Sequence, residues 1–290
     1  MNISSAFRLV RLGLIAALAA SPALAQNQIN FPAPSPSATV KQTVGLTNIE
    51  INYSRPAAKG RQVFGGLVQY DQVWRTGANE STKITFDGPI EFGGVAVPAG
   101  TYAIYSVPGR DTWEVMLSSN AELFGSYGYS ADADVARVTV NPTRLATPLE
   151  SLAISFEAVV DDSARLNIAW ANVQVSVEIT ADTQDVLVPQ IKAVMAGDGD
   201  KKPYFPAAMY YYAKGIHLKQ AAKWITTAAE QNPDAFWVSY RQGLVLAAAG
   251  DKAGAIRAAK ASIAKASAND NRELREEYLR LNEALIASLK

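Results

Sequence analysis

The sequence predicts an antiparallel all-β sandwich followed by an all-α helical-repeat domain. Short segments rich in Val, Ile, Thr, Tyr and Phe, with turn residues between them, fill the chain up to about residue 180. No helix-like segment interrupts them, which favours antiparallel hairpins over a parallel α/β sheet. Beyond that point the composition changes, and alanine-rich stretches with helical spacing take over.

The N-terminus has the pattern of a secretory signal peptide. Arg8 and Arg11 precede a short apolar run over 12–20, and small residues occupy positions 23 and 25. We predict a signal peptide over 1–25, cleaved near Ala25, and therefore a periplasmic or secreted protein. The alternative is a retained anchor, but the apolar run is about half of the roughly 20 residues that a bilayer requires. We expect no membrane span after cleavage.

Residues 26–37 form a Pro-rich linker, because three prolines within six residues disfavour both helices and central strands. The predicted sandwich domain follows over 38–183. Alternation of apolar and polar residues, as in Ile49–Tyr53 and Val173–Ile179, is typical of strands with one wet face. The predicted strands are Ala38–Val44, Ile49–Tyr53, Thr82–Phe86, Val95–Val97, Tyr102–Val107, Trp113–Leu117, Val135–Val140, Leu152–Val159, Ala164–Trp170 and Val173–Ile179.

We predict a second linker over 184–203, because a Gly- and Asp-rich stretch precedes Lys201-Lys202-Pro203. The helical domain then spans 204–290. Its expected helices are Ala207–Lys214, Leu218–Gln231, Ala235–Ala249, Lys252–Ala266 and Glu273–Leu289.

The helical part contains a repeat of tetratricopeptide length. Similar segments begin at Ala221 and Ala255, 34 residues apart, which is the period of that helix-turn-helix unit. On this register one face presents four apolar or aromatic side chains that suit a protein or peptide partner: Tyr210, Trp237, Tyr240 and Leu244. The alternative is that these side chains pack against the β domain.

Charge divides along the same boundary. Residues 26–190 hold 10 Lys and Arg against 17 Asp and Glu, whereas 191–290 hold 15 against 10. Either the composition simply drifts, or the acidic and basic halves dock on each other. The whole chain balances at 27 of each sign, so we expect no nucleic-acid partner.

Several chemistries are excluded by composition. The chain has no cysteine and one histidine, His217, to which we assign a surface or helix-capping role. Disulfides, thiol nucleophiles and cysteine-ligated metals are therefore impossible, and we expect neither a metal site nor a cofactor. No P-loop, dinucleotide, zinc-protease or serine-hydrolase motif is present.

The densest group of unusual residues lies in the segment 73–83. Trp74, Arg75, Asn79 and Glu80 place an indole, a guanidinium, an amide and a carboxylate close together, and Tyr53 and Arg55 lie upstream. A ring beside planar hydrogen-bonding groups is typical of sugar or carboxylate recognition. We therefore predict that these six residues bind a small polar ligand or glycan.

A structural role for the same segment is the alternative. Arg75 and Glu80 would then form an ion pair, Trp74 would fill the core, and Gly77 or Asn79 would adopt a positive φ angle.

The runs I-N-Y-S-R-P, V-W-R-T-G-A-N-E-S-T-K-I, P-A-G-T-Y-A-I-Y-S-V-P-G and D-D-S-A-R-L-N-I-A-W-A-N carry a family resemblance. With them, the region from about Pro34 to Thr180 resembles an exported bacterial family catalogued as domain of unknown function 2911. The resemblance implies a β protein with a signal peptide, in some members with a helical-repeat tail, and it implies no activity.

The function these features favour is an exported, noncatalytic binding or assembly module of unknown ligand. The alternative is an envelope hydrolase acting on glycans, with Glu80 as acid or base. Such an enzyme needs a second carboxylate roughly 5 to 10 Å away, for which Asp87 or Glu91 are the candidates.

Overall fold

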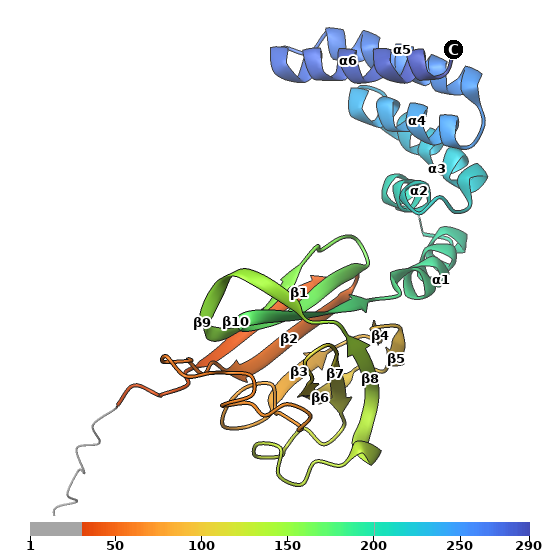
Figure 1. The fold of residues 1–290 in the computed structure, drawn as a ribbon. Helices are drawn as coiled ribbons and strands as arrows, with labels where there is room; N and C mark the ends of the chain where they lie inside the picture. The colour runs from red at the N-terminus through yellow and green to blue at the C-terminus, as the bar shows by residue number, and fades with distance from the viewer. Residues whose placement is uncertain (1–30, 200) are drawn as a thin grey trace, which may run out of the picture.

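The computed structural model describes residues 31–199 and 201–290, and it confirms the predicted order of a β sandwich and then a helical domain (Figure 1). The predicted signal peptide and the start of the Pro-rich linker lie outside the described residues. The strands are β1 (Ser37–Val44), β2 (Thr47–Ser54), β3 (Thr82–Phe86), β4 (Ile90–Phe92), β5 (Val95–Val97), β6 (Gly100–Pro108), β7 (Trp113–Ser118), β8 (Asp134–Val140), β9 (Thr143–Glu157) and β10 (Ser163–Thr180).

Two antiparallel sheets make up the sandwich. One has six strands in the order β1-β2-β3-β6-β7-β8, and the other has four in the order β5-β4-β10-β9. Alternation along β2 confirms the predicted register: Ile49, Ile51 and Tyr53 are buried, and Glu50 and Asn52 face outward. The inward faces of the two sheets share one large hydrophobic core.

The last two predicted strands form one strand, β10, with a sharp corner. Ala171 adopts a positive φ of 51° there, and the pairing with β9 shifts register on both sides of it. The chain folds back on itself at this corner, because Ser176 Oγ donates to Asn167 Oδ1 at 2.7 Å and Ala181 N donates to the carbonyl of Asp162 at 2.8 Å. The short strand β4 was not predicted, since three residues carry too little periodicity to be recognised.

The helices are α1 (Thr183–Ala196), α2 (Tyr204–Ala213), α3 (Leu218–Gln231), α4 (Phe236–Ala248), α5 (Lys252–Ser267) and α6 (Arg272–Ser288). Each of α2 to α5 packs on the next helix, and α4 also contacts α2 and α6. Gly243 of α4 lies so close to α5 that an added Cβ would stand 3.3 Å from the carbonyl of Ala255. The backbones of α4 and α5 therefore approach each other closely at this position.

The prediction of a linker over 184–203 is wrong for most of its length, because α1 occupies it. Asp182 caps this helix by accepting from the backbone N–H of Asp185 at 3.1 Å. Leu187, Ile191 and Met195 recur every four residues and pack into the same hydrophobic cluster as α2 and α3. Pro189 within the helix concealed this pattern in the sequence.

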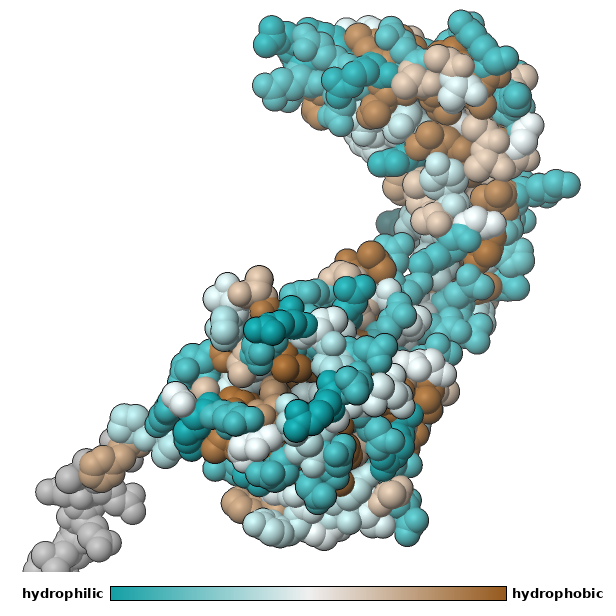
Figure 2. Space-filling view, viewed as in Figure 1, coloured by the Kyte–Doolittle hydropathy of each residue, from teal (hydrophilic) through white to brown (hydrophobic). Residues whose placement is uncertain are grey.

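The two halves meet at the turn between β9 and β10. Lys214, at the C-terminal end of α2, forms an ion pair with Asp162 and lies 3.6 Å from a carboxylate oxygen of Asp161. The carbonyl of Asp161 in turn accepts from Gly45 N, in the turn between β1 and β2. One basic residue of the helical half thus docks on two acidic residues of the sandwich. Away from this junction, Figure 2 shows an open hollow between the outer helices and the sheets.

The Asp162–Lys214 pair should make the stability of the protein depend on pH. Burial, the largest single cause, raises the pKa of Asp162, but the hydrogen bond and charge of Lys214, with a smaller contribution from Thr183, together outweigh it, and the pKa lies below the ordinary value of 3.8. The stabilisation is therefore complete above the unfolded-state pKa and is lost as pH falls through the lower folded-state pKa.

We expect Asp162→Asn to lower the free energy of unfolding by about 1 kcal/mol near neutral pH. The difference from the wild type should shrink as pH falls below 3.8 and vanish once the folded-state carboxyl is also protonated, because both proteins then carry a neutral side chain. Urea unfolding across this range measures it, with Asp111→Asn in an exposed turn as control. An equal deficit at every pH would show that the charge of Asp162 contributes nothing.

Candidate functional site

The segment 73–83 runs along the end of β6 and is fixed there by its backbone. Trp74 and Ser106 exchange two backbone hydrogen bonds of 2.7 and 2.9 Å. The indole of Trp74 turns into the core, where it is 9% exposed, and its Nε1 donates to the carbonyl of Gly77 at 3.0 Å. Trp74 thus fills the core, as the structural alternative predicted, and it also lines the cavity described below.

Thr76 is held in a strained conformation immediately after Arg75. It is a fully buried β-branched residue with a φ of 52°, in the left-handed region that such residues rarely adopt. Its hydroxyl is 2.8 Å from that of Ser106, and its carbonyl accepts from Thr82 Oγ1 at 2.8 Å. Buried hydrogen bonds therefore hold the strained turn. Sequence inspection assigned no role to Thr76, because backbone strain leaves no mark in composition.

A cavity of about 400 Å³ opens beside this turn, and we call it the Arg75 cavity. The guanidinium of Arg75 lies against the loop at Gly125, while its Nε is buried without a hydrogen-bond partner. The floor includes Trp74 and Trp170, whose rings stack with centroids 6.0 Å apart. The lining residues are Pro34, Ser35, Pro56, Ala57, Lys59, Arg61, Leu67, Val68, Trp74, Arg75, Gly77, Ala78 and Trp170.

Charge in the Arg75 cavity is of one sign. Lys59, Arg61 and Arg75 line it, and none of its lining residues is acidic. Arg61 is oriented by two hydrogen bonds of 2.9 and 2.8 Å to the carbonyls of Ala58 and Ala57. The expected ion pair between Arg75 and Glu80 is absent from the ion pairs of the described chain. The carboxylate of Glu150 accepts from the backbone N–H of Lys59 at 2.7 Å but is not part of the lining. The charged side chains of the lining residues are therefore of the kind that pairs with carboxylate or phosphate groups.

Four of the six predicted ligand-binding residues do not line this cavity. Tyr53 is buried between the sheets, where its hydroxyl accepts from Ile154 N at 3.0 Å. Arg55 donates from Nε to the carbonyl of Leu152 at 2.9 Å, which ties β2 to β9. Both side chains join the two sheets and are engaged there.

Asn79 and Glu80 lie on the exposed side of the turn. Asn79 has a φ of 61°, as the structural alternative predicted for Asn79 or Gly77, and it donates to Ser54 Oγ at 3.1 Å. Glu80 precedes β3 and Asp87 follows it, so at about 3.3 Å per residue they stand roughly 20 Å apart. That exceeds the spacing of glycosidase carboxylates. Asp87 is also engaged by Asn48, whose hydrogen bonds lower the pKa of Asp87.

The residues predicted to bind a partner are spread over two helices. Trp237 of α4 is 49% exposed, whereas Tyr240 is half-buried and packs edge-on against Tyr278 at 5.7 Å. Leu244 is also half-buried. Tyr210, on α2, has a buried hydroxyl without a hydrogen-bond partner, and the nearby Asp162 contributes to a raised pKa that is mainly due to burial.

Between residues 31 and 290, leaving out the masked position 200, no group of three or more His, Asp or Glu side chains is placed to hold a metal ion. In the same ranges no helix combines the length and the apolarity needed to cross a membrane.

These features define a two-part protein, a β sandwich with a cationic cavity and a tail of stacked helices. A family model described as "Protein of unknown function (DUF2911)" matches residues 35–179, half of the chain, and the chain belongs to this family. The matched region covers the sandwich and most of the lining of the Arg75 cavity. Comparisons with curated proteins and with solved structures found no match.

The strained turn provides a test of how firmly Arg75 is held. Thr76→Val keeps the shape of the side chain but leaves the buried hydroxyl of Ser106 without its partner. We expect the free energy of unfolding to fall by about 1 to 2 kcal/mol. Urea denaturation measures the change, with Thr139→Val at an exposed position of β8 as the matched control. Equal stability of the two variants would show that this hydrogen bond does not hold the turn.

Proposed function

We propose that the protein is an exported, noncatalytic binding module whose sandwich domain binds an anionic small molecule or acidic sugar in the Arg75 cavity. The observation that carries this proposal is the buried Nε of Arg75, which has no protein partner and belongs to a residue that lines the cavity. An unsatisfied buried donor costs free energy, and an acceptor on a ligand would remove that cost.

The shape and chemistry of the cavity support the same conclusion. About 400 Å³ is in the range of small-molecule sites, and the stacked indoles of Trp74 and Trp170 offer an apolar edge beside the charges. Acidic sugars combine a carboxylate with an apolar ring face. No Asp, Glu or His lines the cavity, so the usual side chains for general acid–base catalysis are missing from it. This favours binding over turnover.

For the helical half we retain the proposal of a tetratricopeptide-like tail that binds a protein or peptide. The stacking of α2 to α6 and the exposure of Trp237 support it. Trp237 is the member of the predicted set with the most accessible ring, and aromatic side chains dominate many protein interfaces.

Acidic sugar oligomers provide a direct test of the Arg75 cavity. We expect oligouronates to bind the mature protein and the matching neutral oligosaccharides to bind at least ten times more weakly, because only the former pair with the cations. Arg75→Ala should weaken oligouronate binding at least tenfold without a large change in melting temperature. Isothermal titration calorimetry measures both, and Arg165→Ala, at an exposed position of β10, is the control.

Two outcomes would contradict this proposal. If Arg75→Ala lowers the melting temperature strongly but still binds oligouronate, Arg75 has a structural role. If the wild type cleaves an envelope glycan and Glu80→Gln does not, the protein is the hydrolase considered above.

A further inference from the structure

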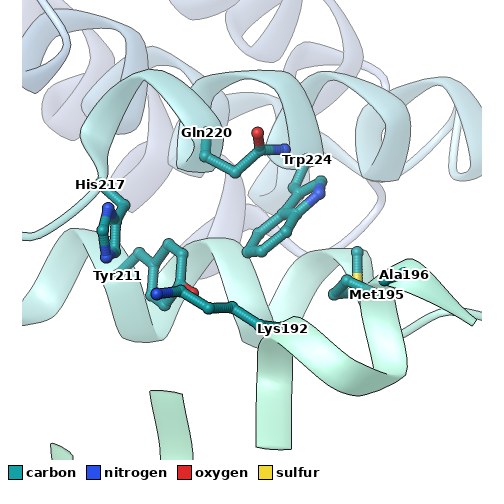
Figure 3. Close-up of a pocket in the computed structure, with 7 residues that line it drawn as sticks. All are labelled: Lys192, Met195, Ala196, Tyr211, His217, Gln220 and Trp224. Atoms are coloured by element: carbon teal, nitrogen blue, oxygen red, sulfur yellow. The ribbon is translucent and has the colours of Figure 1, made fainter. Parts of the chain in front are cut away.

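A second cavity lies in the helical half, where α1, α2 and α3 meet (Figure 3). Its volume is about 420 Å³, and we call it the Tyr211 cavity. Helix α1 contributes three of its lining residues, α2 one, and the start of α3 the others. The lining residues are Lys192, Met195, Ala196, Tyr211, His217, Gln220 and Trp224.

The walls of the Tyr211 cavity are largely aromatic. The ring of Tyr211 lies 5.1 Å from the ring of His217 and 5.1 Å from that of Trp224, and neither pair is stacked face to face. Met195 adds a flexible apolar side chain. Such a lining suits a flat apolar group, since aromatic rings prefer offset or edge-on neighbours.

The polar groups of the Tyr211 cavity are mainly donors. Tyr211 is 1% exposed, yet its hydroxyl has no hydrogen-bond partner. Burial raises the pKa of Tyr211, so the hydroxyl keeps its proton and can donate a hydrogen bond. Figure 3 shows Lys192 extending from α1 toward Tyr211 and His217, and no acidic residue lines the cavity. The Tyr211 hydroxyl and the Lys192 ammonium group are therefore suited to bind a negatively charged hydrogen-bond acceptor.

The start of α3 strengthens this preference. His217 is its N-cap residue and is exposed, as the predicted surface role requires, but its side chain makes no capping hydrogen bond. Its φ of 47° is left-handed, and residues strained in this way cluster at binding sites. The uncapped N-terminus of a 14-residue helix carries partial positive charge, and Lys219 and Lys223 of the same helix add to it.

We propose that the Tyr211 cavity binds an aromatic carboxylate. The aromatic group would lie against Tyr211 and Trp224, and the carboxylate would accept from the Tyr211 hydroxyl and pair with Lys192. The same chemistry is offered by a free aromatic acid and by the C-terminal residue of a peptide that ends in phenylalanine. This site is separate from the Arg75 cavity and does not depend on it.

The test uses phenylacetate and its uncharged analogue phenylacetamide as probes. Binding to the mature protein is followed by calorimetry and by tryptophan fluorescence, to which Trp224 in the cavity contributes as one of five tryptophans. We expect phenylacetate to bind at least five times more tightly than phenylacetamide. Tyr211→Phe keeps the ring and removes the hydroxyl, and Lys192→Met removes the charge. Each should weaken phenylacetate binding at least fivefold.

Two controls separate this site from other effects. Lys260→Met removes a charge from an exposed position of α5, and Arg75→Ala disables the Arg75 cavity; both should leave phenylacetate binding unchanged. Equal binding of the acid and the amide, binding that survives Tyr211→Phe and Lys192→Met, or no binding of either probe would each overturn the proposal. Should phenylacetate bind as expected, a tripeptide ending in phenylalanine identifies the source. If the tripeptide binds with a free C-terminus but not with an amidated one, the ligand is the end of a peptide. If neither form of the tripeptide binds, the ligand is a free acid.

Discussion

The sandwich is organised around four aromatic side chains that meet between its sheets. Phe64 lies edge-on to Trp74, Trp113 and Trp170, with ring centroids 6.1, 4.9 and 6.4 Å away. Trp113 comes from the six-stranded sheet, Trp170 from the four-stranded sheet, and Phe64 and Trp74 from the long connection between β2 and β3. This cluster therefore holds the connection against both sheets at once. Trp74 and Trp170, at the outer edge of this cluster, form the floor of the Arg75 cavity.

Because Trp74 is anchored in this cluster, the position of Arg75 is largely set by folding. The indole is bonded to Gly77, and the strained backbone of Thr76 is held by buried hydrogen bonds on both sides of the turn. Ordering a long side chain costs free energy that a ligand would otherwise have to supply. Here the turn, the neighbouring loop at Gly125 and the burial of Nε have already restricted the guanidinium. A ligand in the Arg75 cavity would therefore not have to order this side chain.

The sequence predicted those parts of the fold that depend on periodicity. Every predicted strand overlaps a strand of the structure, although the last two lie within the single strand β10, and the gap predicted between Trp170 and Val173 is the corner at Ala171. The errors arise where periodicity fails: β4 is too short to show alternation, and a proline interrupts the pattern of α1. Local patterns identify helices and strands. A proline makes a helix seem unlikely in such a pattern, but the contacts of the whole helix can outweigh the free energy that the proline costs.

The candidate site was predicted only in part, for a different reason. Residues such as Tyr53 and Arg55 were grouped with Arg75 because they are close in sequence and chemically versatile. Whether a side chain faces a cavity depends on contacts across the fold, and both residues are engaged by the backbone of β9. Conversely, Trp170 reaches the cavity from almost a hundred residues away, within a strand whose composition resembles that of any buried strand. The sequence therefore predicted the segment that borders the cavity, but only the packing of the whole fold shows which residues line it.

The distribution of charge is a second, independent argument for anion binding in the Arg75 cavity. Residues 26–190 contain 10 basic and 17 acidic side chains, so a randomly placed cavity in this half would have more carboxylates than cations around it. Instead, three of those basic residues line one cavity and no carboxylate does. Bringing like charges together costs free energy in the absence of a ligand, and a stable domain tolerates that cost most readily where a bound anion offsets it. In the helical half basic residues are in excess, so Lys192 lining a cavity is weaker evidence for an anion site. There the argument depends on the buried hydroxyl of Tyr211, which has no partner in the protein and lines a cavity that an acceptor could fill.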